Sequence, residues 1–192
     1  METTLTELLS PLCKTDEDRE ILAALEAELE ELDIGGDIAF FENGMDFEFN
    51  LPEGDVPKHS DVPASFHAIS KVFGAIWWDG GGPEVGWALQ EDGSPDADGS
   101  LFEEIEDEYP EEFEEIKEAG KVIPSFMGGQ NALFFDPTRQ LANGEPAMAF
   151  VSHEGGGWEP VESVNQLDYG QILLRMISDA MIDSNHIPEI YF

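Results

Sequence analysis

Residues 38–51 read IAFFENGMDFEFNL, and this stretch decides the fold class. From Met45 to Leu51 apolar and polar side chains alternate, as in an antiparallel strand with one buried face. An apolar run at 38–41 precedes this strand, and the turn Glu42-Asn43-Gly44 contains the Asn-Gly pair that tight hairpin turns favour. We therefore expect a β-hairpin whose apolar face needs helices to cover it.

Helices are predicted on both sides of this hairpin. Residues 15–33 predict a helix in which Thr15 and Asp18 form a capping box. Residues 63–73 predict a second helix, and 164–182 predict a third that closes the chain. The inner face of the second helix should carry Phe66, Ile69 and Phe73, and the third should be capped by Ser163 and Gln166.

Further strands complete the pattern. A second hairpin is expected from 75–78 and 85–89, around a glycine-rich turn at 79–82, with a loop over 91–100. Later apolar runs predict short strands at 122–123, 132–135, 147–151 and 158–161. This order predicts an α+β fold, an antiparallel sheet with helices packed on it, in a single domain over 1–192.

The charge of the chain is its most unusual property. It contains 43 acidic against 8 basic residues, a formal net charge of −35. Such a surface repels phosphate backbones and anionic lipids, so direct binding of nucleic acid or membrane is not expected, whereas a basic protein partner would be attracted. The acidic start, the lack of a long apolar run and the single Cys13 predict a cytoplasmic protein.

The acidic residues are concentrated in the first two thirds of the chain. Residues 1–126 hold 34 acids and 6 bases, a net of −28, while 127–192 hold 9 acids and 2 bases, a net of −7. The densest stretch, 101–118, has ten acids and one lysine around apolar residues at helical spacing, with Pro110 either kinking a helix or starting another. We predict that partners bind Glu103, Glu104, Asp107, Glu108, Glu111, Glu112 and Glu115, together with Asp79 in the second hairpin.

The sequence contains no complete motif for catalysis, for a metal or for a cofactor. His153-Glu154 begins like a zinc-protease motif, but Gly157 stands where the second histidine belongs. A calcium loop over 94–105 fails because Ile105 occupies the position of the bidentate glutamate. The two glycine triplets lack the residues of a phosphate loop. Pairs of carboxylates for glycoside hydrolysis are expected by chance in a chain with 43 acidic residues, so they do not indicate an active site. We therefore expect no catalytic residue, no metal and no cofactor.

A family resemblance follows from several short motifs. Val62-Pro63-Ala64-Ser65-Phe66 opens a helix that leads to the glycine turn at 79–82, and short strand motifs follow at 133–136, 144–146, 149–154 and 158–161 before the closing helix. Over about residues 60–182 this order resembles the SUKH superfamily, α+β proteins that include many bacterial immunity proteins against toxins. The resemblance implies a protein-binding core without shared catalytic residues, to which 1–60 would be an N-terminal extension.

Together these features predict an immunity-type inhibitor rather than an enzyme. Its acidic face would occupy the basic cleft of a partner toxin, such as a nuclease. Two alternatives remain open at this point. The chain could be a salt-adapted acidic protein of unrelated role, or a carboxylate-dependent hydrolase.

Overall fold

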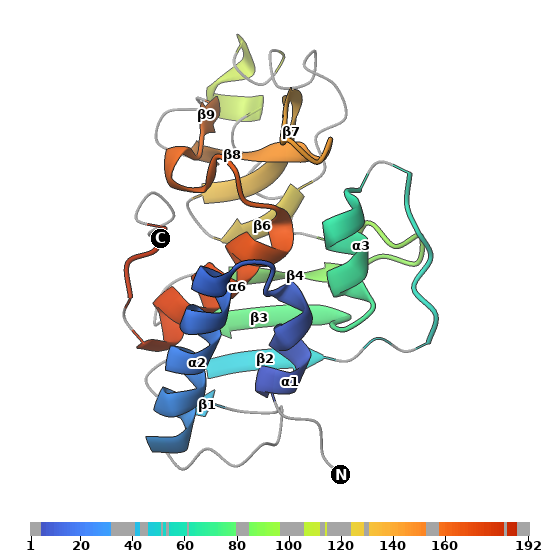
Figure 1. Cartoon of the computed structure of the whole chain (residues 1–192). Coiled ribbons are helices and arrows are strands. Elements are labelled where there is room, and N and C mark those ends of the chain that lie inside the picture. The colour runs from blue at the N-terminus through green and yellow to red at the C-terminus, as the bar shows by residue number, and fades with distance from the viewer. Residues whose placement is uncertain are drawn as a thin grey trace.

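A computed structural model describes the fold over residues 5–31, 41–42, 46–50, 52, 54–60, 62–79, 85–96, 106–111, 114, 124–128, 131–152, 158–182 and 184–187. Within these ranges the strands form one nine-stranded sheet in the order β1-β2-β3-β4-β6-β7-β8-β9, with β5 paired to β4 (Figure 1). All neighbouring strands run antiparallel. The strands are β1 (Phe41–Glu42), β2 (Asp46–Asn50), β3 (Ala75–Asp79), β4 (Val85–Leu89), β5 (Pro95–Asp96), β6 (Pro124–Gly128), β7 (Asn131–Gln140), β8 (Pro146–Ser152) and β9 (Trp158–Pro160).

Both predicted hairpins are confirmed. Glu42, expected in the first turn, belongs to β1 and pairs with Asp46 of β2, which leaves the connection at 43–45; residues 38–40 of the expected first strand lie outside the described residues. In the second hairpin Trp78 of β3 pairs with Val85 of β4. Two strand predictions need correction, and a third, at 122–123, lies outside the described residues, next to β6. Residues 95–96 were expected in a loop but pair with β4. Strand β7 extends to Gln140, beyond the predicted end at 135, with a register shift after Asp136.

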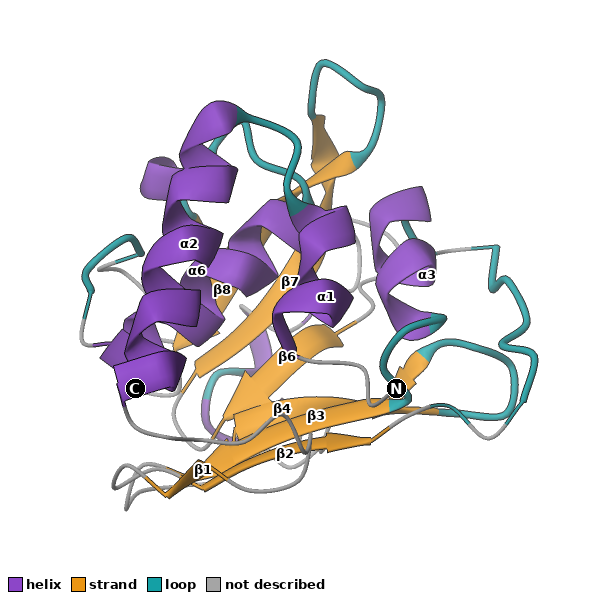
Figure 2. Cartoon of the chain, turned by 60° about the horizontal axis from the view of Figure 1, so that its bottom comes forward, coloured by secondary structure: helices purple, strands orange, loops and turns teal. Residues whose placement is uncertain are grey.

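Helices cover one face of this sheet. In Figure 2 α1, α2, α3 and α6 lie on the same side of the strands β1 to β4. The helix α2 confirms the prediction for 15–33, and α3 confirms the core of the prediction for 63–73. The helical elements are α1 (Leu5–Leu9), η1 (Ser10–Leu12), α2 (Asp16–Glu31), α3 (Ala64–Ser70), η2 (Glu162–Val164) and α6 (Tyr169–Ile182).

The start of the closing helix was predicted wrongly. Residues 162–164 form the short 3-10 turn η2, Gln166 is exposed, and α6 begins only at Tyr169. The reason is a second capping box. The backbone N–H of Gln171 donates to the Asp168 carboxylate at 3.1 Å, and the N–H of Asp168 donates to the Gln171 side chain at 3.2 Å. This box satisfies the first turn of α6 where it meets the core.

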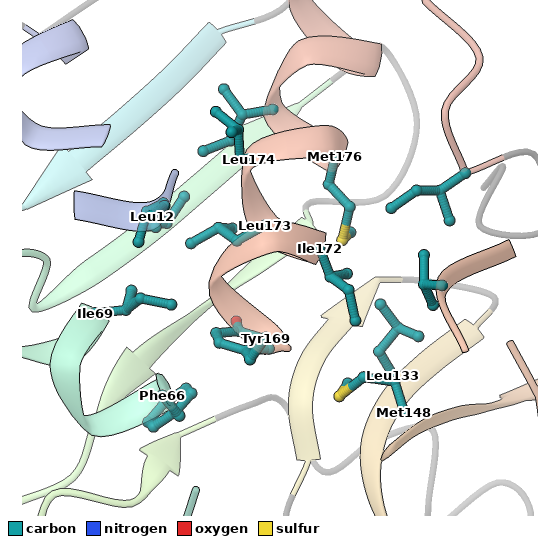
Figure 3. Close-up of a cluster of buried hydrophobic side chains, with 14 of the residues drawn as sticks. Leu12, Phe66, Ile69, Leu133, Met148, Tyr169, Ile172, Leu173, Leu174 and Met176 are labelled. Atoms are coloured by element: carbon teal, nitrogen blue, oxygen red, sulfur yellow. The ribbon is translucent and has the colours of Figure 1, made fainter. Parts of the chain in front are cut away.

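The main core lies between the helices and the sheet, with α6 at its centre. Helix α6 contacts α2, α3 and η1, and Leu173, Leu174 and Ile177 are fully buried. Figure 3 shows Leu12 of η1 and Phe66 of α3 on one side of this helix, and Leu133 and Met148 of the sheet on the other. The rings of Phe66, Phe135 and Tyr169 pack at centroid distances of 5.2–5.8 Å. The predicted inner face of α3 is confirmed, because Phe66, Ile69 and Phe73 are all buried.

Strand β7 is buried on both of its faces. Leu133 and Phe135 belong to the core under α6, whereas Phe134, between them, and its partner Ala149 on β8 lie on the opposite face. Both Phe134 and Ala149 are nevertheless fully buried. Burial on two faces explains why this part of the sequence is a continuous apolar run rather than an alternating one.

Candidate partner-binding surface

The acidic segment exposes its carboxylates. Residues 106–108 and 110–111 are helical and Tyr109 between them is not, so a helical turn restarts at Pro110. Proline suits the first position of a helix because its missing N–H would have no partner there. Tyr109, a member of the predicted apolar stripe, is half-buried. The described acidic residues of this segment, Glu106, Asp107, Glu108, Glu111 and Glu114, are all exposed.

The predicted site residues are only partly gathered in one place. Asp107, Glu108 and Glu111 share the described part of the acidic segment, while Glu103, Glu104, Glu112 and Glu115 lie outside the described residues. Asp79 is the last residue of β3, where it pairs with Asp46 of β2. In Figure 1 the yellow-green helical turns of the acidic segment lie at the top, near β7 and β9, and β3 lies in the lower half. Asp79 therefore does not join the described part of the acidic segment.

Three basic side chains pair with buried carboxylates, a feature that the sequence did not reveal. Lys14 pairs with Asp168, Arg139 with Asp136 at 2.7 Å, and Arg175 with Asp18 at 2.7 Å. All three aspartates are buried. Because these bases neutralise buried carboxylates, they do not offset the acidic residues on the exterior.

Asp18 is the centre of the largest of these networks. It is fully buried and accepts hydrogen bonds from Arg175, from the side chain of Gln171 at 2.9 Å, and from the backbone N–H groups of Lys14 and Thr15. The Thr15 hydroxyl accepts the N–H of Asp18 at 3.2 Å, which confirms the predicted capping box of α2. Burial alone would raise the pKa of Asp18, but these hydrogen bonds hold it well below its usual range. The network joins the starts of α2 and α6.

A second network fixes the bulged end of β7. Asp136 accepts hydrogen bonds from Thr138 and Arg139, and Arg139 also donates to the carbonyl of Met148 at 2.6 Å and to Asn165 at 3.2 Å. Burial opposes ionisation of Asp136, yet its bonds to Thr138 and Arg139 lower its pKa. The residues tie β7 to β8 and to the turn before α6, so their role is structural.

The surroundings of Cys13 do not activate its thiol. Burial and, after it, the charge of Asp18 raise the pKa of the Cys13 thiol, in the direction expected of an unreactive cysteine. Within the described ranges, no group of three or more histidine, cysteine, aspartate or glutamate side chains is placed to hold a metal ion. In the same part of the chain, no helix combines the length and apolar character needed to cross a membrane.

Comparisons with known proteins leave the family open. The chain matches no model of a protein family, and neither curated proteins nor solved structures gave a match. The resemblance to the SUKH superfamily therefore stays a prediction that rests on the short motifs quoted above.

Proposed function

We propose that this chain is a cytoplasmic, immunity-type inhibitor that binds a basic protein toxin through an acidic surface. The segment 106–114 is the centre of that surface. The toxin and the inhibitory role come from the sequence resemblance, and the nature of the binding surface comes from charge. A nuclease suits the role because its cleft is basic and binds a polyanion.

One observation carries the proposal. Every described acidic side chain between 106 and 114 is exposed, while three basic side chains form ion pairs with buried aspartates. The exposed carboxylates of this short segment carry like charges and repel one another, which disfavours the folded arrangement. A basic partner would offset this cost and would be drawn in at a high rate by the field of the surface.

Salt adaptation is the competing explanation, and the exterior of α2 favours it. Glu17, Glu20 and Glu26 are exposed there, away from the acidic segment in Figure 1. If the acidity serves only to keep the chain hydrated at high salt, no single face should matter more than another.

The test starts with affinity capture from the native host, using the full chain as bait, followed by co-expression of the captured protein with the chain. We expect a basic partner whose toxicity the chain suppresses. Association rates are then measured for two variants that change the net charge by the same amount. The first carries E106Q, D107N, E108Q and E111Q, and the control carries E7Q, E20Q, E26Q and D55N, all exposed positions.

The two variants separate the explanations. If the acidic segment binds the partner, the first variant associates about tenfold more slowly, with a weaker salt dependence, and the control stays close to wild type. Equal slowing of both variants would mean that only net charge matters. Failure to capture any basic partner, together with unfolding of the chain at low salt, would support salt adaptation instead.

A further inference from the structure

The turn between β7 and β8 carries an Asn-Gly pair on the surface of the molecule. Asn143 and Gly144 are both exposed, so water reaches both residues of the pair. Gly144 has φ +85°, a conformation that glycine adopts without strain. No heavy atom lies within 4 Å of a Cβ built on Gly144, so no neighbouring group covers the pair from that side.

An exposed pair of this kind can modify itself without an enzyme. The backbone nitrogen of Gly144 attacks Cγ of Asn143, the new bond closes a cyclic imide, and Nδ2 leaves as ammonia with the proton of the attacking nitrogen. Water then opens the imide. Opening at Cγ gives aspartate, and opening at the backbone carbonyl gives isoaspartate, in which the main chain is one methylene longer. Glycine in the second position favours the attack because it has no Cβ to crowd the nitrogen.

Hydrogen bonds of the folded turn oppose this reaction. The attacking N–H of Gly144 donates to the carbonyl of Leu141 at 2.9 Å, the bond that closes a β-turn. The carboxamide oxygen of Asn143 accepts the N–H of Glu145 at 3.0 Å, as in an Asx-turn. The N–H of Leu141 donates to the carbonyl of Glu145 at 2.7 Å and holds the two ends of the turn together. The nucleophile and the group that it attacks are therefore both engaged in the folded chain.

We propose that Asn143 is a site of spontaneous deamidation that the folded turn holds in check. The reaction proceeds through openings of the turn, in which the N–H of Gly144 leaves Leu141 and the carboxamide of Asn143 turns toward the freed nitrogen. Because each opening breaks hydrogen bonds of the native state, the folded chain reacts more slowly than the unfolded chain. The site does not depend on the proposed toxin.

One of the two products disturbs the start of α3. The turn positions Glu145, whose Oε1 accepts the backbone N–H of Ser65 at 2.8 Å. Ser65 is the second residue of α3, and an N–H in the first turn of a helix has no partner inside the helix. The added methylene of isoaspartate lengthens the turn, so Glu145 is displaced and Ser65 loses this acceptor. Aspartate at position 143 leaves the main chain unchanged, and its carboxylate still accepts the N–H of Glu145.

The experiment measures the rate of deamidation at Asn143 in the folded chain, in the chain unfolded in urea, and in a synthetic peptide of residues 138–148, all at the same mildly alkaline pH. Peptide mapping by mass spectrometry separates Asn143 from Asn43, which also precedes a glycine. We expect the folded chain to react at least about tenfold more slowly than the other two samples, which corresponds to about 1.4 kcal/mol for opening of the turn. The N143Q variant is the control and should give no product at this position, because glutamine would have to close a larger ring.

A second measurement follows the consequence for α3. The isoaspartyl form is purified from aged protein, and the amide signal of Ser65 is compared by NMR with that of the unmodified chain. This signal should move in the isoaspartyl form. The matched control is N143D, which carries the same added charge on an unchanged main chain, so its Ser65 signal should stay close to that of the wild type.

Each result decides a defined part of the inference. Slow reaction in the folded chain together with fast reaction in the unfolded chain and the peptide supports a site that the turn protects. Equal rates in the folded chain and in the peptide overturn the protection, and no product at Asn143 in the unfolded chain overturns the site. An unchanged Ser65 signal in the isoaspartyl form, or an equal change in N143D, overturns the link between the longer main chain and α3.

Discussion

Replacing Asp18 with asparagine tests the network that joins the starts of α2 and α6. The Asp18 carboxylate is fully buried and lies 2.7 Å from Nη1 of Arg175, which is itself about 5% exposed. The D18N variant keeps nearly the same shape but removes the negative charge. It leaves the buried guanidinium of Arg175 without its main counter-charge.

The structure sets the expected size of the effect. Removing one partner of a buried ion pair costs about 3–5 kcal/mol, because the other charge stays buried without compensation. Glu17 lies 3.4 Å from the second terminal nitrogen of Arg175 and compensates part of the loss. We therefore expect the free energy of unfolding to fall by about 3 kcal/mol, from the low end of that range. The whole free energy of unfolding of a domain is about 5–15 kcal/mol, so a loss of this size is a large part of it.

The assay is urea denaturation followed by circular dichroism at neutral pH, with D16N as the matched control. Asp16 pairs with Arg19 at 2.6 Å, but both side chains are exposed, so its loss should cost at most about 1 kcal/mol. A loss of less than about 1 kcal/mol for D18N, or a loss equal to that of D16N, would refute the view that this buried pair holds the two helices together.

The same variant has a defined pH dependence. The pKa of Asp18 in the folded state lies below its ordinary value of 3.8. A carboxylate of this kind contributes stability above its unfolded pKa and loses that contribution as the pH falls toward the folded pKa. The difference in stability between wild type and D18N should therefore be constant near neutral pH and shrink below about pH 4. A difference that does not change in acid would contradict the proposed role of the charge.

Two further predictions concern the backbone and the surface charge. Gly93 has φ +81° and a Cβ there would lie 2.0 Å from the carbonyl oxygen of Pro57, so G93A should lower the free energy of unfolding by about 2–3 kcal/mol. The control is G144A. Gly144 has φ +85°, but no heavy atom lies within 4 Å of a Cβ built there, so this substitution should lower the free energy of unfolding by only about 1 kcal/mol. Equal losses for the two variants in urea denaturation would contradict the close contact at Gly93. Raising the salt from about 0.01 to 1 M shortens the screening length from about 30 to 3 Å, which should raise the melting temperature because it weakens repulsion among surface carboxylates. A flat melting temperature would show that this repulsion does not limit stability.

Local patterns in the sequence were sufficient for the elements that depend on near neighbours. The alternation in 45–51 and the glycine turns predicted both hairpins, since their partners are joined by short connections. Thr15 and Asp18 predicted the start of α2, and the spacing of Phe66, Ile69 and Phe73 predicted the buried face of α3. The sequence also predicted the acidic segment, and its described carboxylates are exposed.

Contacts between distant parts of the chain decided the rest. Ser163-x-x-Gln166 and Asp168-x-x-Gln171 are similar capping signals, and the second prevails where Lys14, 154 residues away, pairs with Asp168. The pairing of β4 with β6, which joins the two halves of the sheet, and the pairing of Arg175 with Asp18 also cross long stretches of sequence. Periodicity reports which face of an element is buried, but it carries no information about which distant charge or strand will meet that element. Such partners are selected by burial, because a charge or a backbone group removed from water must find its counterpart wherever the folded chain brings one near.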